Sequence, residues 1–418
     1  MRVLLTDGSG LTSRQSASLL GAAGHQVGVL TPVPLMLART TRHVRWSHRV
    51  PVYGSDPLRW ADAALSVLET GRYDVLLPTQ EQVAVLSLFA EDIAARRVGT
   101  VVPPFSGLRR VQDKLTADCL LAELGIPRPS GVVVTEPAAL REIGAPVFVK
   151  TPVGTAGTGV HAARDQDALH RLADRWSDDL DPSGLGGVLV QQPVSGPLTM
   201  VQAVFDRGRL VAAHGNTRDR LGPRNGATHK TSRPLGPIRP LLERLGTGLN
   251  WHGGLALDVI NGPDGPVVID VNPRLVEPGN AAAAGIDLVG ALVDLARCHP
   301  PAGSPPSTPG VRTHQLLLAL VGSENRRQLL AELAAAALDA GDYRRSREEL
   351  TPLRRDPVAG LSLIAFVSAL FIRPALRHEL IGDTVANYAL TPAGWKGLLE
   401  HASLQRPILA EFDEDRSD

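Results

Sequence analysis

The feature that most constrains the fold is a pair of apolar segments separated by a strong turn signal. The segments span residues 254–259 and 267–271, and they flank Asn-Gly-Pro-Asp-Gly at residues 261–265. Clusters of Gly, Pro, Asn and Asp mark turns, and short apolar segments beside such clusters are typical of strands. The sequence therefore predicts a β-hairpin, within a region of mixed α and antiparallel β structure.

Both strands of this hairpin carry oxygen donors. Asp258 lies in the first strand, and the second ends in Asp270, Asn272 and Arg274. Alternate residues of a strand share a face, so the last three side chains are expected together. Carboxylate and amide oxygens bind magnesium, and a guanidinium offers a forked donor to a phosphoryl group. The pattern favours a magnesium and phosphate site, although the two Asp residues alone also fit turn or edge charges.

The first hundred residues alternate apolar strand-like segments with helical ones. Strands are expected at residues 2–6, 26–30 and 74–77, and Gly8-Ser9-Gly10 turns the chain into a helix. Such alternation predicts a parallel sheet with helices on both faces. Ligands bind at the carboxyl ends of such strands, so Glu81 is a candidate to face an active-site cleft.

A loop rich in Gly and Thr follows Lys150, which ends a predicted strand at residues 147–150. The loop, residues 154–159, has the backbone freedom that wrapping a phosphate requires. It is not a Walker A loop, because no Lys-Ser/Thr follows its last glycine. Taken alone, such a loop is more often a simple turn.

Two further segments complete the pattern. Gln112-Asp113-Lys114 opens a predicted helix, and a predicted strand at residues 188–191 leads into a bent connector that ends at Gly196. Backbone groups of such a connector can read an adenine edge, although each segment also fits a helix cap or a strand end.

The order and spacing of these segments are more specific than any one of them. DKLTADCLLAELGIPRP, FVKTPVGTAGTGV, VLVQQPVSG and LDVINGPDGPVVIDVNPR together resemble the ATP-grasp superfamily. The chain looks most like the carboxylate–amine ligase branch, related to carbamoyl phosphate synthetase and biotin carboxylase. The resemblance covers roughly residues 1–295.

The resemblance implies a pre-ATP-grasp α/β domain with a parallel sheet, followed by a two-lobed ATP-grasp domain of mixed α+β structure. We place the first domain at residues 1–104 and the second at 105–299. Within the second, the small lobe covers about 130–192 and the metal-binding lobe about 193–299. A Pro-rich stretch at 300–309 is typical of a linker, and residues 310–418 are expected to be mostly helical.

The resemblance also implies roles for individual residues. Those expected to bind ATP are Lys114, Lys150, Gly154, Gly157, Thr158, Gly159, Gln191, Gln192, Val194 and Thr199. Asp258, Asp270 and Asn272 would hold magnesium, with Mn²⁺ as an alternative ion, and Arg274 would steady an acyl phosphate. The segment before the hairpin borders the acceptor pocket in relatives, which makes Arg218 and Arg220 catalytic candidates and Arg224 and His229 substrate-binding candidates.

Three departures from the family pattern bear on activity. Both metal positions usually hold Glu, whereas this chain has Asp258 and Asp270. The connector carries Gln191-Gln192 where Glu is more usual. The acid that often follows the connector's glycine is missing, so contact with the ribose falls to Thr199.

The resemblance implies an enzyme that activates a carboxylate as an acyl phosphate with ATP and joins it to an amine, with amino acids or small peptides as substrates, as in specialised metabolism. Two alternatives stay open. One is a carboxylase or carbamoyl-type enzyme that uses bicarbonate. The other, motivated by the departures, is a nucleotide-binding scaffold that has lost catalysis.

Composition narrows the partners and the location. Lys plus Arg and Asp plus Glu are 43 each, and without a basic excess a nucleic-acid partner is not expected. Cys119 and Cys298 lack metal-type spacing, which predicts reduced, buried thiols in the cytoplasm. The start does not resemble a signal peptide.

Residues 358–372 are apolar but shorter than the roughly 20 residues of a membrane span, so a buried helix is favoured over a membrane-surface contact. A homodimer is consistent with the superfamily.

Overall fold

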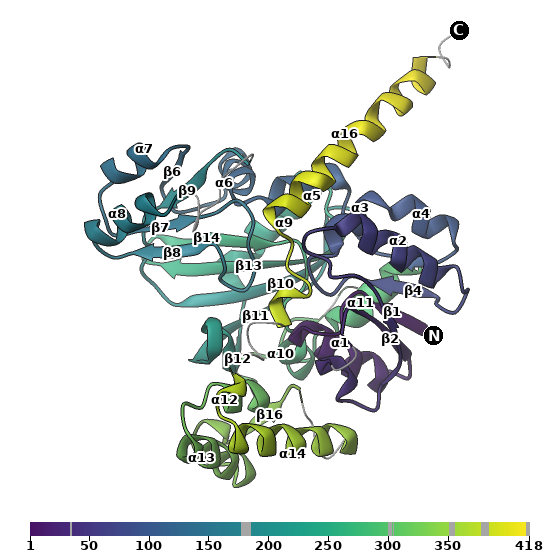
Figure 1. The fold of residues 1–418 in the computed structure, drawn as a ribbon, viewed down its shortest axis with the longest axis vertical. Coiled ribbons are helices and arrows are strands. Elements are labelled where there is room, and N and C mark those ends of the chain that lie inside the picture. The colour runs from purple at the N-terminus through teal and green to yellow at the C-terminus, as the bar shows by residue number, and fades with distance from the viewer. Residues whose placement is uncertain are drawn as a thin grey trace.

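The computed structural model describes residues 1–33, 36–176, 185–299, 303, 305–350, 356–377 and 384–414, without the side chains of Arg224 and of residues 405–414. Of the predicted linker, residues 300–302 and 304 lie outside this part. The described chain forms three sheets, and the helices within residues 316–372 lie beneath them in the view of Figure 1. The domain boundaries given above stay a prediction.

The first sheet is parallel throughout, as predicted, with the order β3-β2-β1-β4-β5. Its strands are β1 (Arg2–Leu5), β2 (Gln26–Thr31), β3 (Val44–Arg49), β4 (Val75–Leu77) and β5 (Gly99–Thr100). The helices between them are α1 (Leu11–Ala22), α2 (Pro57–Leu68), α3 (Val83–Leu88) and α4 (Ala90–Ala95). The predicted helix after the first strand is therefore α1, which begins at the carboxyl end of β1.

The second sheet is small, with the order β6-β9-β7-β8. Its strands are β6 (Gly131–Val134), β7 (Val147–Lys150), β8 (Val160–Ala163) and β9 (Val188–Gln191). Two short helices, α7 (Pro137–Glu142) and α8 (Gln166–Asp174), pack Leu140, Leu169 and Leu172 on it. The helices α5 (Phe105–Gln112) and α6 (Lys114–Glu123) precede it.

The third sheet holds the predicted hairpin and has the order β14-β13-β10-β11-β12-β15-β16. Its central strands are β10 (Leu198–Asp206), β11 (Arg209–Leu221) and β12 (Ala227–Arg233), and the hairpin is β13 (Gly253–Gly262) with β14 (Gly265–Asn272). The helix α9 (Arg239–Leu249) covers one face. The helix α11 (Leu288–Ala296), which follows α10 (Gly279–Ala283), packs its leucines and valines against the first sheet and so joins the two parts.

The C-terminal region is mostly helical, as predicted, and also extends the third sheet. Its helices are α12 (Leu316–Val321), α13 (Arg326–Ala337), α14 (Pro357–Ile372) and α16 (Pro392–Glu414). The strands β15 (Arg312–His314) and β16 (Ser346–Glu348) continue the sheet beyond β12. Near its start α16 places Trp395 and Leu398 in the core of the first domain, and its other end projects from the molecule (Figure 1).

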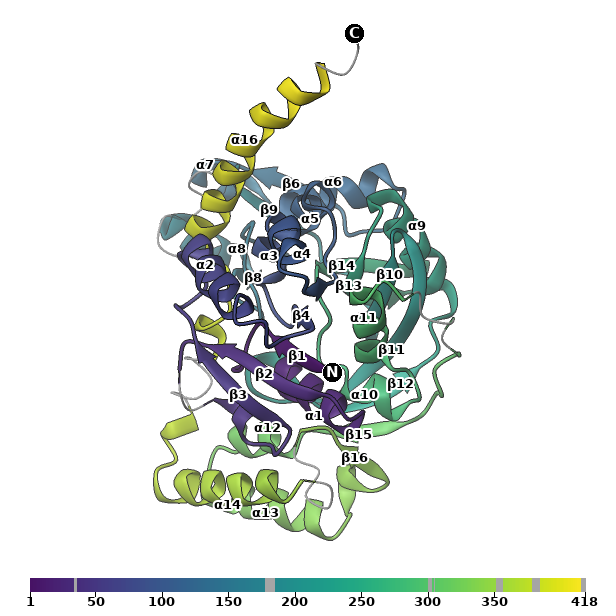
Figure 2. The same cartoon turned by 90° about the vertical axis from the view of Figure 1, so that its right-hand side faces the viewer.

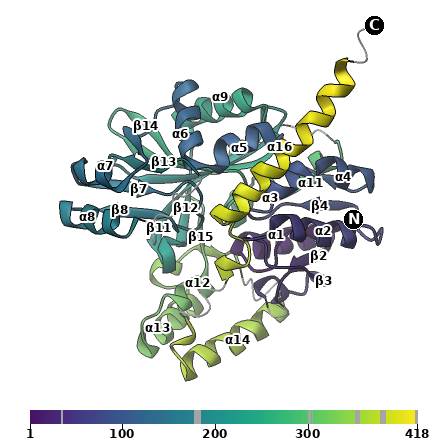
Figure 3. The ribbon, with the colours of Figure 1, turned by 45° about the horizontal axis from the view of Figure 1, so that its top comes forward.

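The helix α14 contradicts the expectation that residues 358–372 are buried. Leu361, Ile364 and Ile372 are 70%, 65% and 76% exposed, because only one side of the helix meets the rest of the chain. It lies beside α13 below the first sheet (Figure 2) and runs toward the β3 end of that sheet (Figure 3). The two arginines that precede the helix, Arg354 and Arg355, lie outside the described residues.

The prediction that both cysteines are buried is also wrong. Cys119 lies on the outer side of α6 and Cys298 just after α11, and both are exposed. The described residues contain no helix that is long and apolar enough to cross a membrane.

Candidate functional site

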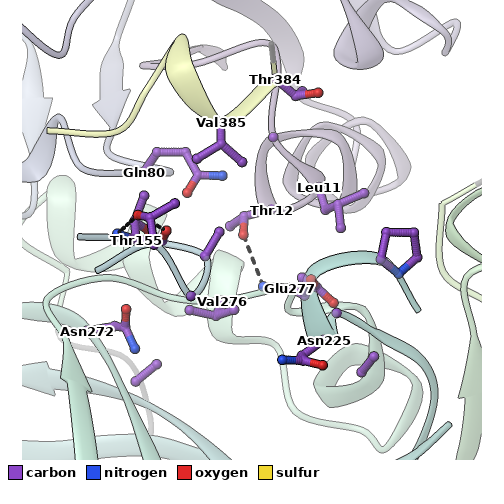
Figure 4. A pocket seen from close by; sticks show the side chains of 18 of the residues that line it. Leu11, Thr12, Gln80, Thr155, Asn225, Asn272, Val276, Glu277, Thr384 and Val385 are labelled. Atoms are coloured by element: carbon purple, nitrogen blue, oxygen red, sulfur yellow. Dashed lines mark hydrogen bonds between the residues drawn. The ribbon is translucent and has the colours of Figure 1, made fainter. Parts of the chain in front are cut away.

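A large cavity of about 1390 Å³ lies where the three sheets and the C-terminal helices meet. Figure 4 shows part of its lining, with side chains from the first domain, the glycine-rich loop, β14 and the segment before α16. The predicted site residues that line it are Lys114, Lys150, Gly154, Gly157, Thr158, Gln191, Gln192, Val194, Arg218, Asp258, Asp270, Asn272 and Arg274. Residues from all four sequence segments therefore meet at one cavity.

The hairpin places its two carboxylates face to face. Asp258 on β13 is paired directly with Asp270 on β14. Burial raises the pKa of Asp258 to about 6, and repulsion from Asp270 and attraction from Arg218 and Lys150 act on it in opposite directions. A divalent cation between the carboxylates would remove this repulsion, so the pair and the Asn272 amide fit magnesium. No cluster of three His, Cys, Asp or Glu side chains suited to a metal occurs in the described ranges.

Two lysines approach the cavity from different elements. The Lys150 ammonium, at the end of β7, donates to the carbonyl of Ile269 at 2.7 Å. The Lys114 ammonium, at the start of α6, donates to the carbonyl of Gly154 at 3.0 Å. Burial lowers the pKa of Lys150, and Asp270 partly offsets that effect. Both ammonium groups thus lie on neutral carbonyls at the cavity, where they are able to turn to phosphate oxygens, and Lys150 also feels the charges of Asp258 and Asp270.

The glycine-rich loop connects β7 to β8 over the cavity. Gly157 and Gly159 have φ of +79° and +72°, a region that glycine adopts without steric cost. A Cβ on Gly159 would lie 2.0 Å from the Thr151 hydroxyl. The loop is closed by the Thr158 hydroxyl, which donates to the carbonyl of Thr155 at 2.6 Å.

The connector end of the site has an unused polar atom. The Gln191 amide donates to Asp118 at 2.9 Å, while its buried oxygen has no partner among the described residues. A buried acceptor left without a partner costs free energy, so this oxygen fits a donor on a bound ligand. Gln192 and Val194 line the cavity next to it.

Arg274 joins three parts of the molecule. Its guanidinium donates to Glu81 of the first domain at 3.0 Å and to the Thr155 hydroxyl of the glycine-rich loop at 2.9 Å. Glu81 also accepts from the side chain of Gln112 at 2.9 Å, and its buried carboxylate does not line the cavity. Glu81 is therefore placed behind Arg274 rather than in the cleft where the sequence predicted it.

Four other predicted residues do not line the cavity. Arg220 forms an ion pair with Glu332 of α13, because its side chain lies on the far side of the sheet's end. His229 is buried against the ring of Tyr343, and burial lowers its pKa to about 4. Thr199 accepts from Asn261 at 2.9 Å, and Gly159 lies at the base of the loop. The side chain of Arg224 lies outside the described residues.

Several lining residues belong to none of the segments that the sequence analysis singled out. These come from the first domain (Val33, Met36 and Leu37), from α12 and α14 (Leu318, Val321 and Phe366) and from the segment before α16 (Val385 and Tyr388). Glu277 also lines the cavity, with a φ of +53° and an ion pair to the buried Lys230 at 2.5 Å. In the sequence, the feature that could have pointed to Glu277 as a lining residue is its position just after the hairpin.

Comparison with known proteins agrees with this geometry. No family model matches the chain. The chain is 27% identical over 198 residues to the carbamoyl phosphate synthase large chain of Thermus thermophilus, a match that covers 44% of this chain and 19% of that protein. The chain thus spans about a fifth of the length of this relative.

Solved structures share the fold. The biotin carboxylase domain of Hydrogenobacter thermophilus 2-oxoglutarate carboxylase aligns with a TM-score of 0.59 at 17% identity, covering 75% of this chain and 74% of that one. An L-amino acid ligase from Bacillus licheniformis aligns with a TM-score of 0.53 at 15% identity, covering 71% and 74%. With the four ordered segments and the sheets they form, these similarities show that the chain has the ATP-grasp fold.

Proposed function

We propose that this protein is an ATP- and magnesium-dependent ligase that joins a carboxylate to an amine through an acyl phosphate. The observation that carries the proposal is the size of the cavity. Pockets for a single small ligand hold about 300–1000 Å³, whereas this one holds about 1390 Å³. The space beyond the carboxylate pair suits an organic acid and an amine better than bicarbonate alone.

The proposed chemistry assigns a task to each group. An oxygen of the acid attacks the γ-phosphorus of ATP, and the bond to ADP breaks. The Lys114 and Lys150 ammonium groups and the Arg274 guanidinium balance charge on the phosphoryl oxygens, which is the main requirement of such transfers. Magnesium held by Asp258, Asp270 and Asn272 would supply further charge neutralisation.

The second step joins the amine. Its neutral nitrogen attacks the acyl carbon, the bond to phosphate breaks, and the nitrogen loses a proton as the amide forms. Closure of residues 154–159 over the phosphates would exclude water, which otherwise hydrolyses the acyl phosphate. The glycines of this loop supply the backbone freedom that closure needs.

Bicarbonate remains the second candidate for the carboxylate. The relatives described above include a carbamoyl phosphate synthase chain and a biotin carboxylase domain that was crystallised with magnesium-bound ADP and bicarbonate. The same domain was crystallised as a dimer, and a homodimer stays part of our proposal. Small carboxylates and amines are the proposed partners.

Release of ADP tests the proposal, with hydroxylamine as a general amine that traps acyl phosphates as hydroxamates. We expect ADP and hydroxamate to form together when ATP, magnesium and an organic acid are supplied. Asp270→Ala should abolish both products, because it removes one of the two carboxylates expected to hold the metal. Asp264→Ala in the exposed turn of the same hairpin is the matched control and should keep full activity.

The other outcomes separate the alternatives. ADP release that requires bicarbonate and no organic acid would replace the ligase with the carboxylase or carbamoyl-type enzyme. Nucleotide binding without turnover of any acid would replace it with the non-catalytic scaffold. Full turnover by Asp270→Ala would remove the metal assignment.

A further inference from the structure

The cavity continues past the carboxylate pair into an apolar end. This end is lined by Val33 and Met36 of the first domain, Leu318 and Val321 of α12, and Leu363 and Phe366 of α14. Ser362 is the polar side chain that α14 adds to the described lining, and neither α12 nor α14 adds a charged one. The triphosphate and the metal ion are strongly polar and gain nothing from such a wall, and the adenine is assigned to the connector at residues 191–194.

Buried polar contacts hold this wall in place at the near end of α14. Asp356, the residue that caps α14, accepts from the Thr41 hydroxyl and from the backbone N–H of Arg42 at 3.2 Å. The fully buried guanidinium of Arg14 lies 3.8 Å from the same carboxylate. The start of α14 is therefore fixed to the first domain.

A second buried cluster fixes the strands next to the wall. The ammonium of Lys230 on β12 pairs with Glu277 at 2.5 Å and with Glu349 at 2.8 Å. Gln15 of α1 donates to Glu349 at 2.9 Å, and so does Thr313 of β15 at 2.5 Å. Because these contacts join the first domain, the third sheet and the C-terminal region, the apolar end is preformed rather than left over from loose packing.

In Figure 4, Asn272 of the proposed metal site and Thr155 of the glycine-rich loop lie on one side of the pocket, and Leu11 and Asn225 lie on the other. Val276 and Glu277 lie between them. A substrate carboxylate must reach the phosphates beside Asp270, Asn272 and Arg274. The rest of an acid that is too large for this polar part then extends toward α12 and α14.

We propose that the carboxylate substrate is an acid with a bulky apolar side chain, such as a hydrophobic amino acid, and that this side chain lies against α12 and α14. The inference rests on the ligase function proposed above and adds the class of acid. Transfer of apolar surface from water to such a wall is favourable by roughly a fourfold gain in affinity for each buried methylene group.

Hydroxamate formation with hydroxylamine tests the acid separately from the natural amine. The series is alanine, leucine, methionine and phenylalanine, with glutamate and lysine as charged acids of similar length. We expect kcat/KM for leucine, methionine or phenylalanine to exceed that for alanine at least about tenfold. Equal rates across the series, or a preference for glutamate or lysine, would overturn the inference and leave the ligase intact.

A pair of variants on α14 locates the effect. Phe366→Ala should lower kcat/KM for the apolar acids about tenfold and leave alanine nearly unchanged, because it removes part of the wall. Phe371→Ala makes the same change on the same helix outside the cavity lining and should leave the series as it was. Phe366→Leu keeps an apolar side chain and covers the case in which Phe366→Ala does not fold.

Two further results are decisive. The value of kcat/KM could prove equal for all the acids and yet rise with the apolar size of the amine. That result would assign this end of the cavity to the amine and overturn the inference. An absence of ADP and hydroxamate with every acid would overturn the ligase function, and this inference with it.

Discussion

Arg274 is the residue through which the first domain acts on the proposed phosphoryl site. Its guanidinium is oriented by Glu81 behind it and by Thr155 in the glycine-rich loop. A guanidinium donates in a fixed planar geometry, so the position of the Glu81 carboxylate sets the direction of its free N–H groups. We regard Glu81 as a positioning residue.

Glu81→Gln should therefore lower kcat about 10- to 100-fold with little change in the Kd of ATP, since about 1.4 kcal/mol corresponds to a factor of ten. Glu81→Asp should recover part of the activity because it restores the charge. Glu332→Gln breaks another Arg–Glu pair, with Arg220, away from the cavity, and it should leave kcat unchanged. Equal losses in kcat for Glu81→Gln and Glu332→Gln would mean that Glu81 acts only through stability.

Among the individual residues that line the cavity, the sequence predicted those that lie within one short motif. Lys150 and Asp270 both line the cavity. They were predictable because each lies in a strand whose alternation of side chains between two faces can be read directly from the residues. Arg218 and Arg220 were both catalytic candidates and lie two residues apart, but only Arg218 lines the cavity. The register of β11 against β12 shifts between them, which breaks the alternation. A bulge of this kind leaves no clear mark in the residue pattern.

Among the elements, α14 depends most on one side chain. Asp356 accepts from the N–H of Ala359, which caps the helix, and it also faces the buried guanidinium of Arg14. Asp356→Ala should lower the free energy of unfolding by about 3–5 kcal/mol, because it leaves a buried charge without its partner. It should also raise the KM for apolar acids, since α14 forms part of the proposed wall.

Denaturant unfolding measures the first effect, and α8 offers a matched control. Asp165 caps α8 in the same way but is exposed, so Asp165→Ala should cost only about 1 kcal/mol. A loss for Asp356→Ala no greater than the loss for Asp165→Ala would show that the contact with Arg14 adds nothing beyond the cap.

The elements that the sequence predicted are those with continuous apolar runs or clear turns. The β13–β14 hairpin and the strands β1, β2, β4, β7 and β9 lie where the residues placed them, within a few positions. The strand β3 was not predicted, because its alternating exposed residues, such as Arg45 and Ser47, suit an edge strand with little burial. The strands β12, β15 and β16 carry mostly polar residues whose partners lie far along the chain, so no local pattern identifies them.

At the scale of the whole molecule, three buried imidazoles among the described residues stay neutral in the folded state. Burial lowers the pKa of His214, His229 and His314 to about 4. In the unfolded chain the imidazole pKa is about 6.5, so the unfolded state takes up protons first as the pH falls. Their contribution to the free energy of unfolding is fully present above about pH 6.5, declines as the pH falls and is lost by about pH 4. At pH 5 each imidazole has lowered the free energy of unfolding by roughly 1–2 kcal/mol.

A histidine variant isolates this effect from other titrating groups. His214 accepts or donates between Asn280 at 2.7 Å and Ser307 at 2.8 Å, and His214→Gln keeps a polar side chain there. Between pH 7 and pH 5 the variant should lose about 1–2 kcal/mol less stability than the parent protein, measured by denaturant unfolding. His170→Gln on the exposed side of α8 should follow the parent curve. Parallel curves for all three proteins would show that His214 does not contribute to the pH dependence.

The strand order of the third sheet has a consequence for how the chain is synthesised. On the ribosome β12 emerges well before β15 and β16, which complete the sheet beside it. Until they arrive, β12 is an open edge whose free N–H and C=O groups can pair with another nascent chain. The wall formed by α14 comes later still. A growing chain therefore becomes able to hold the proposed acid only after α14 has been synthesised, and a chain terminated before β15 keeps an unpaired edge strand that can aggregate.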